Sequence, residues 1–142
     1  MKITDIQTIF VDRYLFVQVH TDAGITGLGE SGAWGYLEAS AGAVETFKRY
    51  LIGQDPMRIE HHWQYLYRWS AFRGAAIMGA LSAVDIALWD IMGKHFGVPC
   101  YQLLGARRAE SAGLLPCLWL NTEQLIRVVL TPRTRASPPW AI

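Results

Sequence analysis

The sequence predicts an α+β fold, a three-stranded antiparallel meander followed by a helical bundle. Two observations support this class. Residues Ile3–Val11 are rich in Ile, Thr, Phe and Val, and the side chains of Tyr14–His20 alternate between two faces. From Tyr36 to Leu104 the apolar residues recur every three or four positions instead. Strands that precede helices, without alternation of the two, are typical of an α+β protein.

The first two strands are predicted at Ile3–Val11 and Tyr14–His20. The first segment contains Ile, Thr, Phe and Val and few helix-forming residues. The second alternates cleanly, and its apolar face consists of Leu15, Val17 and Val19. Only Asp12 and Arg13 separate the two segments, and a connection this short makes neighbouring strands antiparallel.

The third strand is predicted at Ile25–Glu30, after a turn at Thr21–Gly24. Gly24 can take the positive φ that such a turn often needs. Gly27 and Gly29 leave the third strand without a side chain at two positions. A strand position without a side chain lets another backbone approach closely. We therefore expect another element to pack tightly against this strand.

Residues 27–32 also match G-x-G-x-x-G, the pattern of a dinucleotide-binding loop. Such a site needs a parallel βαβ unit and an acidic residue about twenty positions further on. Here an antiparallel hairpin precedes the glycines, position 52 is Ile within a predicted helix, and Glu30 would repel a pyrophosphate. We interpret the glycines as serving the geometry of the sheet and the exit from its third strand.

The first helix is predicted from Tyr36 to a stop near Gly53. Its apolar stripe is Leu37, Ala41, Val44, Phe47 and Leu51. Asp55 and Pro56 are residue types of an N-cap and a first turn, so the second helix is expected to start there. This second helix should present Ile59, Trp63 and Leu66 to the core.

The third helix is the longest and is predicted from near Gly74 to a stop at Gly97–Pro99. Its apolar stripe is Ile77, Leu81, Val84, Leu88 and Ile91. Several small residues on it permit close helix approach: Ala76, Gly79, Ala80 and Ala87. Tyr101–Leu104 is expected to form a last short turn.

The composition indicates a folded and nearly neutral protein. Hydrophobic residues make up 51 % and charged residues 18 %, which argues against disorder. The formal charge of +1 gives no indication of a nucleic-acid or membrane partner. Cys100 and Cys117 are too few for a disulfide scaffold. The apolar stretch Gly74–Val84 is too short to span a bilayer and no apolar signal core is visible, so a cytoplasmic location is expected.

Two pairs of residues have the chemistry of a site. His61 and His62 are adjacent and point about 100° apart on a helix, unlike the i, i+4 pair that binds metals. Asp85 and Asp90 lie in an otherwise apolar helix and could be catalytic, but five positions separate them. A buried hydrogen bond or a salt bridge with Arg or Lys of a neighbouring helix is the favoured interpretation. We predict no catalytic residue and no metal ligand in this chain.

The C-terminal residues are weakly basic, a property to be weighed as a sign of nucleic-acid binding. Arg133, Arg135 and Trp140 form a small basic tail with one aromatic residue. Two arginines without further clustering indicate a disordered tail more than a nucleic-acid surface.

Four segments together carry a family resemblance: Thr21–Glu30, Ile59–Arg68, Ala80–Lys94 and Gly97–Gly105. They resemble the N-terminal domain of the mandelate racemase/muconate lactonizing enzyme subgroup of the enolase superfamily. The resemblance covers about residues 1–105 and is closest to sugar-acid dehydratases of the galactonate/mannonate type. It implies that residues 1–105 form an enolase-like N-terminal capping domain.

The resemblance also implies a chemistry. In this family a barrel domain holds Mg²⁺ on three carboxylates, and a Lys or His base removes the proton α to the substrate carboxylate. Loops of the cap lie over the barrel mouth, shape the pocket and exclude water. By position, these loops are Asp12–Tyr14 and Ser31–Tyr36.

Four side chains are therefore predicted to face a sugar acid: Arg13, Tyr14, Trp34 and Arg73. The alternative for them is an exposed surface or a contact that docks the barrel.

The chain of 142 residues is shorter than the roughly 200–250 residues of a (β/α)8 barrel. Residues 106–130 are expected to start such a barrel, with a strand at Leu115–Leu120 and a helix from Thr122. Residues 131–142 are expected to be an irregular tail. Back-translated and read two bases later, Arg133–Ile142 permits Ala-x-Leu-Ala-Ala-Leu-Gly-Tyr, which suits the end of a barrel helix. We therefore hypothesise a frameshift near residues 128–130.

We expect this chain alone to be inactive and to bind no Mg²⁺. The surface meant for a barrel would be bare, so self-association through it is expected. The alternative is a module without enzymatic activity that uses the same fold for self-association or for binding a partner.

Overall fold

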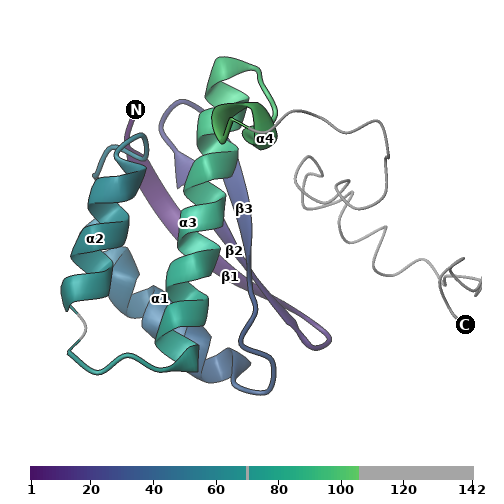
Figure 1. The fold of residues 1–142 in the computed structure, drawn as a ribbon, viewed down its shortest axis with the longest axis vertical. Helices are drawn as coiled ribbons and strands as arrows, with labels where there is room; N and C mark the ends of the chain where they lie inside the picture. The colour runs from purple at the N-terminus through teal and green to yellow at the C-terminus, as the bar shows by residue number, and fades with distance from the viewer. Residues whose placement is uncertain (70, 106–142) are drawn as a thin grey trace, which may run out of the picture. The chain divides into compact units, whose positions relative to one another are not determined.

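The structure, a computed structural model, describes residues 1–69 and 71–105 (Figure 1). The chain divides into two units, Met1–Ala109 and Glu110–Ile142, and the description that follows concerns the first. The predicted start of a barrel at 106–130, the tail at 131–142 and the frameshift hypothesis lie outside the described residues.

The three predicted strands form one antiparallel sheet in the order β1-β2-β3. β1 covers Ile3–Val11, β2 covers Tyr14–Thr21 and β3 covers Thr26–Ser31. The β1–β2 ladder ends where Val11 pairs with Tyr14, so two residues make the turn. In the second turn Gly24 takes a φ of 74°. The predicted meander is confirmed.

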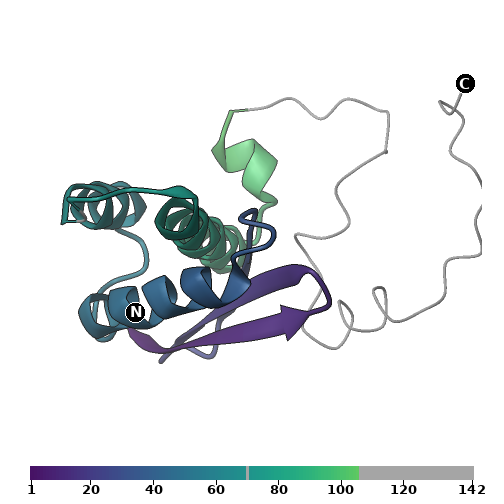
Figure 2. The ribbon, with the colours of Figure 1, turned by 90° about the horizontal axis from the view of Figure 1, so that it is seen from below.

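The helices lie on one face of this sheet (Figure 2). α1 spans Leu37–Leu51, α2 spans Ile59–Trp69, α3 spans Ala75–Phe96 and α4 spans Cys100–Leu103. α1 and α3 pack on the strands, and α2 packs on α3. The predicted helix ends are confirmed, because Gly53 and Gly97 take left-handed φ angles of 81° and 68° just after α1 and α3.

One predicted helix start is wrong. α2 begins at Ile59 and not at Asp55. The Asp55 carboxylate accepts a hydrogen bond from the Met57 N–H (3.1 Å), and the Asp55 carbonyl accepts one from the Arg58 N–H (3.2 Å). Asp55 and Pro56 therefore form a turn ahead of the helix. Their residue types suit a turn as well as an N-cap, so the sequence alone does not separate the two.

α3 lies at the centre of the hydrophobic core. Four residues of its predicted stripe are buried, namely Leu81, Val84, Leu88 and Ile91. The fifth, Ile77, is half-buried. These residues share one cluster with buried side chains of the strands and of α1, among them Ile6, Val17, Val19, Val44 and Phe47. The sheet and both long helices are thus joined by one core.

β3 and α3 touch backbone to backbone. A Cβ atom added at Gly29 would overlap the carbonyl of Ala83, and one added at Gly27 would overlap the carbonyl of Ala87. All four residues are buried. The expectation that another backbone approaches these glycines is confirmed. The first two glycines of the G-x-G-x-x-G pattern therefore serve packing between a helix and a strand.

The outer edge of β3 is hydrogen-bonded to one ion pair of α3. Asp90 is only 3 % exposed and accepts hydrogen bonds from Lys94 Nζ (2.6 Å) and from the Leu28 N–H (2.9 Å). Lys94 Nζ also donates to the Thr26 carbonyl (2.7 Å). The buried salt bridge predicted for Asp90 is confirmed, although its partner lies on α3 itself and not on a neighbouring helix. The charge is tolerated because both a cation and an N–H satisfy it.

α3 is also the one helix of the described residues that could cross a membrane by length and composition. Its most apolar 18-residue stretch has a mean hydropathy of 1.6, and it extends beyond the segment Gly74–Val84 considered above. Half of that stretch is buried inside the protein. Its buried residues pack against the sheet and α1. This is the environment of a core helix.

We expect Gly29→Ala to lower the free energy of unfolding by about 3 kcal/mol, because the new Cβ meets a helix backbone that cannot move away cheaply. Urea unfolding followed by circular dichroism measures this change. Gly42→Ala in α1 is the matched control, since nothing lies within 4 Å of a Cβ atom there. Alanine in a helix is favoured over glycine by about 1 kcal/mol, so the control should be stabilised. Equal effects of the two substitutions would contradict the close packing of β3 on α3.

Candidate functional site

Three of the four side chains predicted to face a substrate lie together. Arg13 Nε and Nη2 donate hydrogen bonds to Tyr14 Oη at 3.3 and 3.1 Å. The guanidinium carbon of Arg13 lies 5.3 Å from the centre of the Tyr14 ring and 5.5 Å from that of Trp34. The two rings meet edge to face, with centres 6.2 Å apart. We call Arg13, Tyr14 and Trp34 the loop cluster.

Two loops position the loop cluster. In the β1–β2 turn Asp12 takes a left-handed φ of 51°, which Asp tolerates better than most residues. The loop between β3 and α1 carries Trp34 and follows the buried Ser31. A Cβ atom added at Gly79 of α3 would lie 2.7 Å from Ser31 Oγ and 2.8 Å from Ala33 Cβ. The loop with Trp34 is therefore seated directly on α3.

The loop cluster presents a cation beside aromatic rings and a hydroxyl group. Arg13 is exposed, and Trp34 is 59 % exposed. A guanidinium offers a planar fork of N–H donors that matches a carboxylate, and the neighbouring rings hold it in place by cation–π contact. This arrangement is suited to binding an organic anion that also carries hydroxyl groups.

Arg73 has a different neighbour. Its guanidinium carbon lies 4.1 Å from the centre of the Tyr67 ring, a cation–π contact between the α2–α3 connection and α2. Beside it in the chain, Trp69 and Phe72 are 57 % and 89 % exposed. Among the contacts of the described residues, none joins Arg73 to the loop cluster.

Glu30, a residue not predicted for the site, lies on the same face of the sheet as Tyr14 of the loop cluster. It pairs with Phe16 across the β2–β3 ladder, and the Phe16 ring lies 6.3 Å from the ring of Tyr14. Tyr14, Phe16 and Glu30 thus share one face of the sheet. Burial raises the pKa of the Glu30 carboxyl, so it takes up a proton more readily than an exposed carboxyl. Only the strand register could have indicated this position.

The two adjacent histidines have separate environments. His61 is exposed, whereas His62 is fully buried. His62 Nε2 lies 2.8 Å from the Asp55 carbonyl oxygen, which can only accept, so Nε2 carries the proton. His62 Nδ1 therefore accepts a hydrogen bond from Tyr50 Oη (3.0 Å). Burial is the main reason why the pKa of His62 is lowered.

The residues of α2 that face the core include the three predicted ones, since Trp63 packs against the core cluster, and one that was not predicted, His62. Ile59, His62 and Leu66 are buried, whereas Trp63 is only half-buried. Tyr50 and the Asp55 carbonyl give the His62 ring the hydrogen bonds that a buried polar group needs. Periodicity alone favours the apolar Trp63, so it could not identify this arrangement.

Asp85 and Asp90 do not form a carboxylate pair. Asp85 is half-buried between α2 and α3, and burial, together with the nearby Glu60, raises its pKa. Asp90 faces β3 instead. In residues 1–69 and 71–105 no group of three or more His, Cys, Asp or Glu side chains could hold a metal ion. The described residues therefore do not fit the Mg²⁺ that the resemblance implies.

A comparison of this sequence with known protein families identifies the family of the chain. Residues 2–105 match the family described as mandelate racemase / muconate lactonizing enzyme, N-terminal domain. The chain belongs to this family. A member of the enolase superfamily from Salmonella Typhimurium has the same fold, with a TM-score of 0.71 and 37 % identity over 77 % of this chain and 30 % of that one. The predicted capping-domain fold is confirmed.

Curated proteins similar to this chain include D-galactonate dehydratases. That of Verminephrobacter eiseniae is 50 % identical over 107 residues, which are 74 % of this chain and 28 % of that protein. That of Variovorax paradoxus is 48 % identical over 109 residues, with 75 % and 28 % covered. This chain therefore spans less than a third of the length of these relatives.

One similar protein of known structure was determined with a bound ligand. An enolase from Pantoea ananatis, determined with bound D-gluconate and Mg, has a TM-score of 0.72 and 36 % identity over 76 % of this chain and 28 % of that one. The described residues thus correspond to the N-terminal domain of sugar-acid dehydratases of the enolase superfamily, as the resemblance predicted.

The buried His62 predicts a dependence of stability on pH. Because the pKa of His62 in the folded protein lies below its ordinary value of 6.5, the unfolded chain binds a proton there that the folded protein does not. This contribution to stability is complete above about pH 6.5 and is lost as the pH falls toward the folded pKa. The loss approaches about 1.4 kcal/mol per pH unit. Urea unfolding at pH 7, 6 and 5 measures it.

His62→Gln isolates this effect, because the amide can still donate to the Asp55 carbonyl but does not titrate. We expect the variant to be less stable at pH 7 and to lose less stability than the original chain between pH 7 and 5. Titration of Asp5 does not affect this comparison, because Lys48 lowers the pKa of the Asp5 carboxyl to about 2. Any change in stability due to Asp5 therefore occurs below about pH 4. Parallel pH profiles for the two proteins would contradict this role of His62.

Proposed function

We propose that residues 1–105 are the capping domain of a Mg²⁺-dependent sugar-acid dehydratase and that the loop cluster contacts its substrate. The observation that carries this proposal is the convergence of Arg13 and Tyr14 with Trp34, because two separate loops bring a cation and two aromatic rings to one place. The similarity to D-galactonate dehydratases suggests an aldonic acid, a carboxylate with several hydroxyl groups, as the substrate class.

In this proposal the cap binds and shields the substrate and leaves the chemistry to the barrel. Arg13 donates charge-assisted hydrogen bonds to an oxygen of the anion. Trp34 and Tyr14 cover the C–H surface of the sugar acid and keep water away from it. Glu30 lies on the same face of the sheet as Tyr14 and adds a carboxyl group beside this surface. Proton removal and any Mg²⁺ are assigned to the part that the longer relatives have in addition.

A second candidate function is self-association without catalysis. Its specific support is the set of large exposed hydrophobic side chains, which includes Trp69, Phe72, Phe96 and Leu104 at 57, 89, 58 and 64 % exposure. Sedimentation velocity distinguishes the two candidates. A defined dimer would favour an interaction module, whereas polydisperse association would favour a capping domain with an uncovered docking surface.

The 142-residue chain is predicted to be inactive by itself. We expect no dehydration of D-galactonate or other aldonic acids above the buffer rate, with or without Mg²⁺, in an assay for the 2-keto product. The D-galactonate dehydratase of Verminephrobacter eiseniae, 50 % identical over the shared part, is the positive control. Metal-dependent turnover by the purified chain would contradict the proposal.

A chimera tests the role of the loop cluster. Residues 1–105 of this chain replace the matching part of the Verminephrobacter eiseniae enzyme, and kcat/KM for D-galactonate is measured. We expect Arg13→Ala to lower kcat/KM about tenfold or more, because a hydrogen bond to a charged group is worth about 1.5–3 kcal/mol. Trp34→Ala should lower it too, through poorer exclusion of water.

Two further substitutions complete this experiment. Arg49→Ala, on the exposed side of α1, is the matched control and should leave kcat/KM unchanged. Arg73→Ala decides whether the fourth predicted residue also contacts substrate. If Arg13→Ala and Arg49→Ala behave alike in an active chimera, the loop cluster does not bind the sugar acid.

A further inference from the structure

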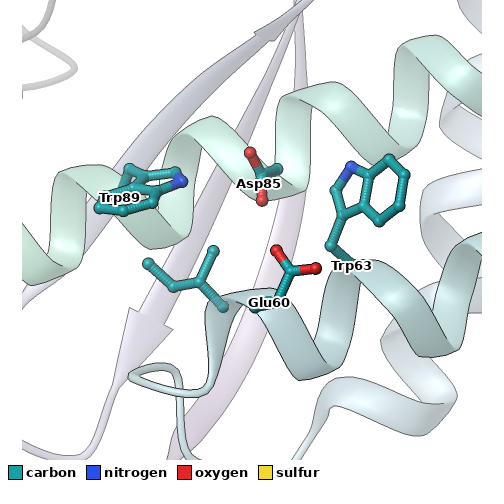
Figure 3. A pocket seen from close by; sticks show the side chains of 5 residues that line it. Glu60, Trp63, Asp85 and Trp89 are labelled. Atoms are coloured by element: carbon teal, nitrogen blue, oxygen red, sulfur yellow. The ribbon is translucent and has the colours of Figure 1, made fainter. Parts of the chain in front are cut away.

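A pocket between α2 and α3 is made from other elements than the loop cluster. It has a volume of about 330 Å³ and is lined by Ile59, Glu60, Trp63, Asp85 and Trp89. Figure 3 shows the carboxylates of Glu60 and Asp85 between the indole rings of Trp63 and Trp89. Two negative charges thus share one opening with two aromatic walls.

No cation compensates these carboxylates within the described residues. Asp85 has neither a hydrogen bond nor an ion pair there, and its charged neighbour is another acid, Glu60. Glu60 Oε1 accepts one hydrogen bond, from the neutral Gln64 side chain (2.8 Å). Two like charges that face one pocket repel each other, and a bound cation would relieve this repulsion.

The aromatic walls add a second and independent preference for a cation. An indole face attracts a cation more strongly than any other aromatic side chain does. Trp63 is also held in place, because it stacks on Tyr67 with ring centres 4.7 Å apart. A ring that is already fixed loses little conformational freedom when a ligand binds.

We propose that this pocket binds a guanidinium group. Guanidinium is planar and weakly hydrated, so it can stack on an indole while its N–H groups donate to a carboxylate. A sugar acid is excluded by charge, and the inference is independent of the function proposed for the loop cluster. The guanidinium can belong to a small free cation or to an arginine side chain of another protein.

The experiment is a titration of the full chain followed by NMR of its six tryptophan indole N–H groups. Trp63→Phe and Trp89→Phe assign the two relevant signals. The probes are agmatine for a free cation, the peptide acetyl-Gly-Arg-Gly-amide for an arginine side chain, and ethylurea as a neutral analogue of a guanidinium. We expect saturable shifts of both indole signals with the two charged probes and none with ethylurea.

Matched variants test the role of the carboxylates. Asp85→Asn and Glu60→Gln keep the shape of the side chains and should each weaken binding about fivefold, as expected for loss of one partly exposed charge pair. Glu38→Gln in the first turn of α1 is the control and should bind like the original chain. Circular dichroism establishes that each variant is folded. Glu60 is exposed, so its variant stays informative if Asp85→Asn unfolds.

The outcomes separate the sources of the ligand. Tighter binding of the peptide would assign the pocket to an arginine of a partner protein, and tighter binding of agmatine would assign it to a small cation. The proposal is overturned if neither charged probe gives a saturable shift, if ethylurea binds equally well, or if the folded Asp85 and Glu60 variants bind like Glu38→Gln.

Discussion

The close approach of β3 to α3 is the constraint on which the rest of this domain depends. Only glycine fits at positions 27 and 29, where the strand meets the carbonyls of Ala83 and Ala87. This contact brings a helix nearer to a sheet than ordinary side chains allow. It also places Asp90 and Lys94 within hydrogen-bond reach of the β3 backbone. A short sheet and a long helix are thus packed into one unit.

The same helix sets the position of the candidate site. α3 continues past the end of β3, and Gly79 lets the loop after Ser31 rest directly on it. Trp34 is carried by that loop, and the short β1–β2 turn brings Arg13 to the same place. The loop cluster is thus exposed but mounted on a well-packed support, as suits a surface that recognises one ligand shape.

Much of the fold could be predicted from the sequence, because its signals are local. Composition and alternation predicted the strands, and the spacing of Leu81, Val84 and Leu88 predicted the buried face of α3. The start of α2 could not be predicted, since Asp55 and Pro56 suit a turn equally well. The site was predicted from family resemblance and loop position. The place of Glu30 on the face of Tyr14 depends on strand register, because it lies opposite Phe16. The burial of His62 in the core depends on hydrogen bonds with Tyr50 and Asp55, which periodicity does not reveal.

Both margins of the small sheet have hydrogen bonds to other parts of the chain. On β3 the Asp90–Lys94 pair forms hydrogen bonds with backbone groups that face outward. On β1 the Lys48 ammonium donates to the Ile6 carbonyl. Ile3 of β1 also donates to the Gln54 carbonyl and accepts from the Gly53 N–H. A three-stranded sheet with open margins would be a template for strand-by-strand growth into fibres. Here Ile3 and Ile6 of β1 and Thr26 and Leu28 of β3 already have backbone groups in hydrogen bonds, which disfavours such growth at these positions.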